Sequence, residues 1–301
     1  MITIIKRNKI DIEKYNLCLE NAVQNADYAA IHFLDIVADE DWLILEYSDY
    51  QAVMPLMIKK KFGIPFVIMP KICQQLGVFS ETDNPTLNAA FHGFLMEKFL
   101  VVQYAFNSEN HFPYAINCKT SYRIQKSEYA SVKKKYSVHR RRNVRILDDF
   151  KDHLQFRNDI NSSDRSFFLN NMKGATSKSD CEAYYHKFLS LVNAKIGWCS
   201  VMEYKNEAQS FVYLYEGKNQ FYLSLFVNNF PVVNTNFPSI MIDYVLQNVI
   251  ELKSFDFMGS EVENVAKFNE RFGAIAYQYP IVYQTKKQII TSIFKKYIPF
   301  L

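Results

Sequence analysis

The stretch FDFMGSEVENVAKFNERFGA, residues 255–274, joins a short strand pattern to a well-marked helix. Phe255 and Phe257 alternate around Asp256, which predicts a strand whose two aromatic residues share one face. Asp256 then lies on the opposite face, although the segment around it is apolar. A carboxylate in this position is a candidate functional residue. The alternative interpretation is that it caps the following helix or faces solvent.

The helix in this stretch has signals at both ends. Ser260 followed by Glu263 forms the S-x-x-E capping box, which predicts that the helix begins at Glu261. Gly273 suits the left-handed residue just past a helix end. Asn269 borders the apolar face and is a second candidate for function. The apolar residues recur three or four positions apart and predict one buried face, namely Val262, Val265, Phe268 and Phe272.

The composition limits the kind of protein that this chain can be. Its 301 residues allow one large domain or two ordinary ones. Only eight glycines are present, beside 25 phenylalanines and 20 tyrosines, which argues against several glycine-built phosphate loops. The net charge of +4 permits an anionic partner without requiring nucleic acid.

Cysteine usage and hydropathy indicate a cytoplasmic protein. The five cysteines form no C-x-x-C pair, which argues against a disulfide framework or a zinc site and for a reducing compartment. No metal is therefore expected. The N-terminal residues lack the apolar run of a signal peptide, and no segment approaches about 18 uninterrupted apolar residues, so stable membrane insertion is not expected.

A repeated order of elements predicts an α+β fold. The first half has strand patterns at 42–48, 51–58, 64–70 and 101–106 and a helical pattern at 86–100. The second half repeats this order, with strand patterns at 198–204, 208–217, 220–229 and 254–258 and a helical pattern at 239–252. The offset of about 155 residues and the similarity of LEYSDYQAVMPL to MEYKNEAQSFVYL indicate an internal duplication.

The residues between the halves are basic and then polar. Residues 127–147 predict one helix, whose positive charges would bind tRNA phosphates or stay solvated. Residues 158–180 predict a surface connection or loop. The expected division is a first domain over 1–125, a basic connecting helix over 126–150 and a second domain over 151–301, with a C-terminal end that can pack back on the first. The basic residues are Lys133, Lys134, Lys135, Arg140, Arg141, Arg142 and Arg145.

Three segments together resemble the Fem family, the tandem-domain branch of the GNAT acyltransferase superfamily. They are MPLMIKKKFGIPFVIMPKICQQLGVFS (54–80), YASVKKKYSVHRRRNVRI (129–146) and the stretch at 255–274. The resemblance implies two tandem GNAT-like domains, each a mixed, largely antiparallel sheet flanked by helices. In that fold two central strands splay apart and an acyl donor lies in the gap. The resemblance also implies transfer of an acyl or aminoacyl group to an amine.

The chain departs from the family pattern in two places. The family commonly has Phe-Lys in its last helix, where this chain has Phe268 and Asn269, and an amide cannot supply a positive charge. The usual pyrophosphate loop is glycine-rich, whereas residues 228–239 contain no glycine. The donor therefore stays open between acyl-CoA, an acyl carrier protein and charged tRNA.

The candidate site residues combine the resemblance with the local patterns. Asp256 would hold the attacking amine, and Asn269 would act beside it, with Phe268 lining the donor channel. Tyr213 and Tyr222 lie on central strands, where their hydroxyls would reach a cleft unless they are core aromatics. Loops carry function disproportionately, so the irregular loop before Gly77 supplies candidates for acceptor contact, namely Lys71, Gln74 and Gln75.

The expected function is N-acyl transfer to a small-molecule acceptor, such as a sugar nucleotide or another cell-envelope precursor. One alternative is an aminoacyl-tRNA-dependent ligase of cell-wall peptides, which predicts tRNA binding through residues 133–145. The other is a non-catalytic protein that kept the fold and only binds. Asn269 and the missing glycines favour this last alternative.

Overall fold

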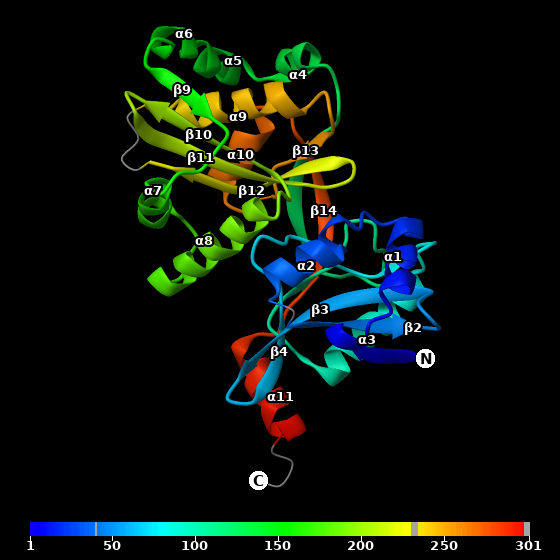
Figure 1. Ribbon diagram of the computed structural model, residues 1–301. Coiled ribbons are helices and arrows are strands. Elements are labelled where there is room, and N and C mark those ends of the chain that lie inside the picture. The colour runs from blue at the N-terminus through cyan, green and yellow to red at the C-terminus, as the bar shows by residue number, and fades with distance from the viewer. Residues whose placement is uncertain (40, 230–233, 260, 298–301) are drawn as a thin grey trace. The chain divides into compact units, whose positions relative to one another are not determined.

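The computed structural model describes residues 1–39, 41–229, 234–259 and 261–297 and separates into two compact units (Figure 1). The first unit contains residues 1–119 and 278–301, and the second contains residues 120–277. Each unit is a mixed β-sheet with helices packed on it, which confirms the α+β fold class. None of the described helices has the length and apolar content needed to cross a membrane.

The sheet of the first unit is built from sequential hairpins. Its strand order is β1-β2-β3-β4-β6, and the short β5 pairs with β3. All neighbours are antiparallel except β4 and β6, which are parallel. The strands are β1 (Ile2–Lys6), β2 (Trp42–Tyr47), β3 (Ala52–Lys61), β4 (Ile64–Ile68), β5 (Phe79–Ser80) and β6 (Leu100–Val101).

The helices of the first unit begin at side-chain caps where the sequence supplies them. Asp11 accepts a hydrogen bond from the amide of Lys14 at the start of α1, and Asn84 caps α3 in the same way. The helices are α1 (Ile12–Asn21), α2 (Ile31–Val37), α3 (Pro85–Lys98) and α11 (Lys286–Tyr297), with 3₁₀ turns at Arg7–Lys9 and Asp27–Ala29.

The sheet of the second unit has the order β8-β13-β12-β11-β10-β9. Only β12 and β13 are parallel among these neighbours. The strands are β8 (Cys118–Ile124), β9 (Leu154–Arg157), β10 (Trp198–Tyr204), β11 (Glu207–Glu216), β12 (Gln220–Asn228) and β13 (Ser254–Asp256). The chain returns to the first unit through β14 (Ile275–Val282), whose end pairs with β7 (Tyr104–Ala105).

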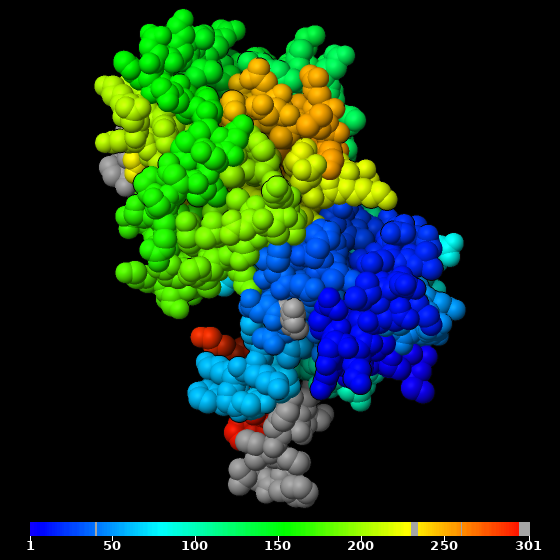
Figure 2. Space-filling model, viewed as in Figure 1, coloured from blue at the N-terminus to red at the C-terminus, as the bar shows by residue number. Residues whose placement is uncertain are grey.

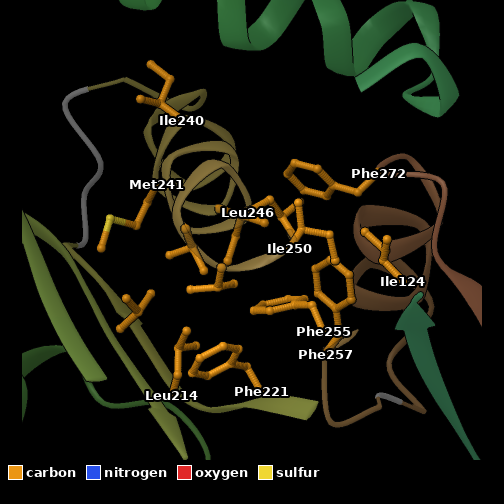
Figure 3. Close-up of a cluster of buried hydrophobic side chains, with 14 of the residues drawn as sticks. Ile124, Leu214, Phe221, Ile240, Met241, Leu246, Ile250, Phe255, Phe257 and Phe272 are labelled. Atoms are coloured by element: carbon orange, nitrogen blue, oxygen red, sulfur yellow. The ribbon is translucent and has the colours of Figure 1, made fainter. Parts of the chain in front are cut away.

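Helices cover both faces of this second sheet. On one face, residues of α9 (Phe237–Val249) and the following Ile250 pack on Leu214, Phe221 and Phe255 (Figure 3). Phe255 and Phe257 both belong to this core, as their alternation predicts. On the other face, α7 (Asp164–Asn171) and α8 (Lys178–Asn193) pack on β11 through rings such as those of Phe188 and Phe211, whose centroids are 5.0 Å apart.

The basic segment forms a broken helix in the second unit. It consists of α4 (Tyr129–Lys135), α5 (Val138–Arg145) and α6 (Leu147–Phe150). The prediction of one continuous helix is wrong, because the backbone of Tyr136 is not helical, with a ψ of 140°, and Ser137 caps α5 by accepting a hydrogen bond from the amide of Arg140. Residues 158–180 likewise contain α7 rather than only a loop, because Phe168 is buried against Phe211.

The helix of the 255–274 stretch differs from its predicted form at the start. It is α10 (Glu263–Glu270), and the expected cap, Ser260, lies outside the described residues. Gly273 has a φ of 78°, as a left-handed residue past a helix end requires. The predicted buried face holds only in its C-terminal part, because Phe272 is buried whereas Val262 and Val265 are exposed.

Candidate functional site

Strands β12 and β13 separate soon after they begin. They pair only over Gln220, Phe221 and Tyr222 opposite Ser254, Phe255 and Asp256. Strand β12 continues to Asn228, whereas β13 ends at Asp256. Within the described ranges, residues 223–228 have β11 on one side and no strand pairing on the other. Such an edge presents backbone N–H and C=O groups that can pair with an extended ligand.

A β-bulge lies where the two strands separate. Tyr213 of β11 opposes Leu225, and Leu214 opposes Leu223, so Ser224 is an extra residue on β12. The residue that a bulge adds is left out of the regular pairing, and bulges are over-represented next to active sites. The bulge therefore changes the direction of backbone groups at the opening of the gap.

Helix α10 carries two of the predicted site residues, and Phe268 lies near this edge. The ring of the half-buried Phe268 lies 6.3 Å from that of Phe226, which is on β12 beyond the separation. Asn269 follows Phe268 and is only 3% exposed. Among the described residues, no group accepts a hydrogen bond from its Nδ2. A buried donor left in this state costs about 1–3 kcal/mol, which a bound acceptor oxygen would offset.

Asp256 is fully buried and surrounded by hydrogen-bond donors. Its Oδ1 accepts hydrogen bonds from Ser121 Oγ at 2.9 Å and from the amide of Met258 at 2.7 Å. Its Oδ2 accepts from Gln220 Nε2 at 3.2 Å and from the hydroxyl of Tyr277. The carboxylate therefore joins strands β8, β12 and β14 to the turn that follows β13.

The charge of Asp256 is balanced by one arginine. Arg123 Nε lies 3.6 Å from Asp256 Oδ2, and the guanidinium stacks on the ring of Tyr277 at 4.4 Å. Burial raises the pKa of Asp256, and the hydrogen bond from Tyr277 and the charge of Arg123 oppose this rise. Burial and the nearby Asp256 carboxylate raise the pKa of Tyr277, which keeps its hydroxyl protonated as a donor.

The two tyrosines of the central strands have different surroundings. Tyr213 is buried, its ring lies 5.2 Å from that of Phe188, and its hydroxyl donates to the carbonyl of Ile196. Tyr222 opposes Asp256 in the parallel pairing and stacks on Tyr215 at 5.7 Å. Tyr222 thus belongs to the surroundings of Asp256, whereas Tyr213 packs beneath α8.

The remaining predicted residues, Lys71, Gln74 and Gln75, are in the first unit. Gln75 is buried, and its side chain donates to Gln74 Oε1 at 3.0 Å and accepts from the amide of Ser108 at 2.9 Å. Lys71 and Gln74 are half-buried. Gly77 has a φ of 123°, and a Cβ there would lie 2.2 Å from Asn110 Oδ1, so only glycine fits this tightly bonded loop.

Arg140, one of the residues of the basic segment, is buried inside the second unit. Its guanidinium lies between the rings of Phe268 and Phe272, at 4.2 and 4.0 Å. It donates to Ser239 Oγ at the start of α9 and to the carbonyl of Phe268. Burial, followed by the charge of Arg271, lowers the pKa of Arg140 to about 10. Arg140 therefore joins α5, α9 and α10.

The sequence patterns did not single out several residues that shape this site. Ser121, Arg123, Gln220 and Tyr277 surround Asp256, yet each lies far from it along the chain. Strand alternation alone was the available signal, since Ser121 and Arg123 alternate with the core residues Tyr122 and Ile124. The pairing of β8 with β13, which brings them to Asp256, has no local signature.

The fold matches those of known structures, although no protein-family model and no curated protein matches the chain. FemX aligns with a TM-score of 0.62 at 10% identity, covering 94% of this chain and 98% of that chain. A conserved protein of unknown function from Bacteroides thetaiotaomicron aligns with a TM-score of 0.58 at 11% identity, covering 94% and 100%. A tandem GNAT protein from the clavulanic acid biosynthesis pathway aligns with a TM-score of 0.55 at 10% identity, covering 93% and 97%. The chain has a Fem-like, GNAT-type fold, as its three quoted segments predicted.

Proposed function

We propose that this protein transfers an acyl group to an amine, and that the donor lies along the unpaired edge of β12. The observation that carries the proposal is the separation of β12 from β13 after Tyr222, with the bulge at Ser224 beside it. An edge strand can pair with the amide groups of an extended donor. The likeness in fold to a tandem GNAT protein supports the same reaction class.

The chemistry needs an unprotonated amine, a polarised carbonyl and donors for the developing oxyanion. The amine nitrogen attacks the donor carbonyl carbon, and the carbonyl oxygen takes on negative charge. A new C–N bond remains when the tetrahedral intermediate expels the leaving group of the donor, and this leaving group takes up the proton that the nitrogen gives up. We assign the unpartnered Nδ2 of Asn269 and the backbone N–H groups near Ser224 to the donor carbonyl.

In this proposal Asp256 is a positioning residue. Its oxygens are occupied by donors from Ser121, Gln220, Tyr277 and Met258, and its side chain is fully buried. It holds the turn after β13 and therefore the end of the gap. Phe268 would line the donor, and Tyr222 would support the side of the gap at which Asp256 lies.

The donor and acceptor are proposed by class. Residues 228–239 contain no glycine for close backbone approach to a pyrophosphate, so the proposal names the acyl group rather than coenzyme A. The acceptor would be a small amine with anionic character, such as a sugar nucleotide or cell-envelope precursor. A tRNA donor has less support, because Arg140 is buried and Arg141 donates to the carbonyls of Lys134 and Tyr136.

A thermal-shift screen tests the proposal. The purified protein is mixed with acetyl-CoA, longer acyl-CoAs, acyl carrier protein, charged tRNA and UDP-sugars. A donor at a hundred times its Kd should stabilise the fold by about 2.7 kcal/mol. We expect the shift to disappear in Asn269→Leu, which replaces the buried amide by an apolar side chain of the same branching. It should remain in Asn264→Leu, an exposed change on the same helix.

Product analysis completes the test. Transfer to an amine, detected by mass spectrometry with any donor that gives a shift, is the expected result. A shift with charged tRNA alone would favour the aminoacyl-tRNA-dependent alternative. Binding of UDP-sugars without any donor shift or product would overturn the proposal in favour of a protein that only binds.

A further inference from the structure

The first unit has an apolar groove of about 490 Å³ that is not part of the proposed acyl-transfer site. Ile64, Phe66 and Ile68 of β4 and Ile289 and Ile293 of α11 line it. Residues 59–61, three consecutive lysines at the end of β3, form its rim. We call this surface the lysine-rimmed groove.

The strand register places positive charge beside the apolar lining. Lys59 opposes Phe66 and Lys61 opposes Ile64, and opposed residues of an antiparallel pair share one face. Lys59 is neutralised by Asp41 at 3.2 Å and Asp39 at 3.6 Å. Lys60 and Lys61 have no acidic partner within the described ranges. The rim is therefore positively charged.

Large apolar side chains project from the same region. Phe62, at the tip of the β3–β4 hairpin, is 92% exposed, and Ile290 and Phe294 on α11 are 55% and 54% exposed. Figure 2 shows the light-blue hairpin and the red part of α11 at the surface of the first unit. A tight turn normally uses Gly, Asn or Asp, yet Phe62 occupies this one with a φ of 51°. The tip thus exposes an aromatic ring at a position that other residues suit better.

The residues just before α11 are hydrogen-bonded to strand β6. The side chain of Gln284 accepts a hydrogen bond from the amide of Val101 at 2.8 Å. The backbone amide of Gln284 donates a hydrogen bond to the carbonyl of Val101 at 3.0 Å. Ile289 and Ile293 then face the groove, whereas Lys286 and Lys287 are exposed. The helix therefore adds further positive charge next to the exposed Ile290 and Phe294.

We propose that the lysine-rimmed groove and the exposed face of α11 dock on a membrane surface rich in anionic lipid. Exposed aromatic and aliphatic residues flanked by lysines suit the boundary between lipid headgroups and acyl chains. A symmetric contact with a second copy fits less well, because it would bring two positively charged rims into the same interface. In this arrangement Phe62 and Phe294 insert at the boundary between headgroups and acyl chains, and the lysines contact lipid phosphates.

Vesicle sedimentation of the full chain tests this proposal. Vesicles of phosphatidylcholine with phosphatidylglycerol should bind the protein, and vesicles of phosphatidylcholine alone should not. Each basic residue near an anionic membrane strengthens binding by about fivefold, so the double variant Lys60→Glu with Lys61→Glu should weaken binding by about 25-fold or more. Phe62→Ser should weaken it by about tenfold. Raising the salt should weaken the binding of the unaltered protein, because exposed charges are screened.

Matched control variants distinguish an effect of this particular surface from an effect of the protein's total charge or hydrophobicity. Lys126→Glu with Lys151→Glu changes the net charge equally at exposed positions elsewhere, and Val23→Ser removes another exposed apolar side chain. These variants should bind anionic vesicles like the unaltered protein. The proposal would be overturned if the protein bound both kinds of vesicle equally, or if the control variants lost as much binding as the groove variants. It would also be overturned if the protein bound no vesicles and formed a dimer that Phe62→Ser dissociates.

Discussion

Asp256 and Asn269 come from one short stretch of sequence, yet their hydrogen bonding differs completely. Both oxygens of Asp256 are occupied by donors, whereas Asn269 Nδ2 has no acceptor within the described part of the chain. A fully satisfied buried group supports structure. A buried donor without an acceptor is a better candidate for contact with a ligand. The two residues therefore have different proposed roles.

Replacement of Asp256 by Asn should destabilise the protein by about 1–3 kcal/mol at neutral pH. The amide cannot accept all the hydrogen bonds that the carboxylate accepts, and Arg123 loses its anionic partner. Urea denaturation measures the change, with the exposed Asp152→Asn as the control. A loss no larger than that of the control would show that the donors around Asp256 contribute little.

The effect of Asp256 on stability should depend on pH. Burial raises the pKa of the folded protein's Asp256 above the ordinary value of 3.8. Between the unfolded and the folded pKa of Asp256, the native state binds more protons than the unfolded state. The contribution of Asp256 to the free energy of unfolding is therefore fully present below about pH 3.8 and is lost as the pH rises through the folded pKa. In urea titrations, the difference in free energy of unfolding between the unaltered protein and Asp256→Asn should shrink from pH 4 upward. An advantage that grows over this range would mean that Arg123 and the donors lower the pKa.

At the scale of elements, buried polar contacts join the basic segment to the second unit. Asp243 of α9 accepts hydrogen bonds from the hydroxyls of Tyr129 and Tyr136, both at 2.9 Å, while Arg140 joins α5 to α9 and α10. Runs of lysine and arginine in a sequence usually predict a solvated surface. Here part of the charge serves to hold helices together.

Arg140→Met should therefore cost about 2–4 kcal/mol of stability, because Ser239 and the Phe268 carbonyl lose their donor and the space between two phenylalanines is refilled imperfectly. Arg142→Met, an exposed change in the same helix, should stay within about 0.5 kcal/mol. Thermal denaturation of both variants makes the comparison. Equal effects would mean that the burial of Arg140 contributes nothing to stability.

At the scale of the whole molecule, the first unit is built from two separate pieces of the chain. Residues 278–301 return to it after the second unit is complete. Ile281 and Val282 pair with Ala105 and Tyr104, and the amide of Phe106 donates to the carbonyl of Pro280. The stability of the first unit thus depends on residues at the far end of the sequence.

A chain that ends at Tyr279 should lose stability in the first unit and keep it in the second. Removing the later residues deletes the partner of β7 and all of α11, whereas the α9 core stays intact. Hydrogen exchange should show reduced protection at residues 100–106 and unchanged protection at 240–250. Uniform loss of protection would mean that the two units unfold together.

The local elements and the type of fold follow from short-range patterns in the sequence. The alternation of Phe255 and Phe257, the helix end at Gly273 and the repeated hairpins were readable, because each depends on residues a few positions apart. The start of α10 and the break between α4 and α5 could not be predicted in this way, because caps and tertiary contacts decide where helices begin and end.

Which side chains meet depends on contacts between distant parts of the chain. Ser121 and Tyr277 reach Asp256 because strands from distant parts of the chain become neighbours, and Arg140 is buried because two other helices close around it. Whether a polar group has partners depends on this long-range packing. The Asn269 Nδ2 without an acceptor and the edge of β12 without a pairing strand, both as found among the described residues, therefore appear only in the folded chain.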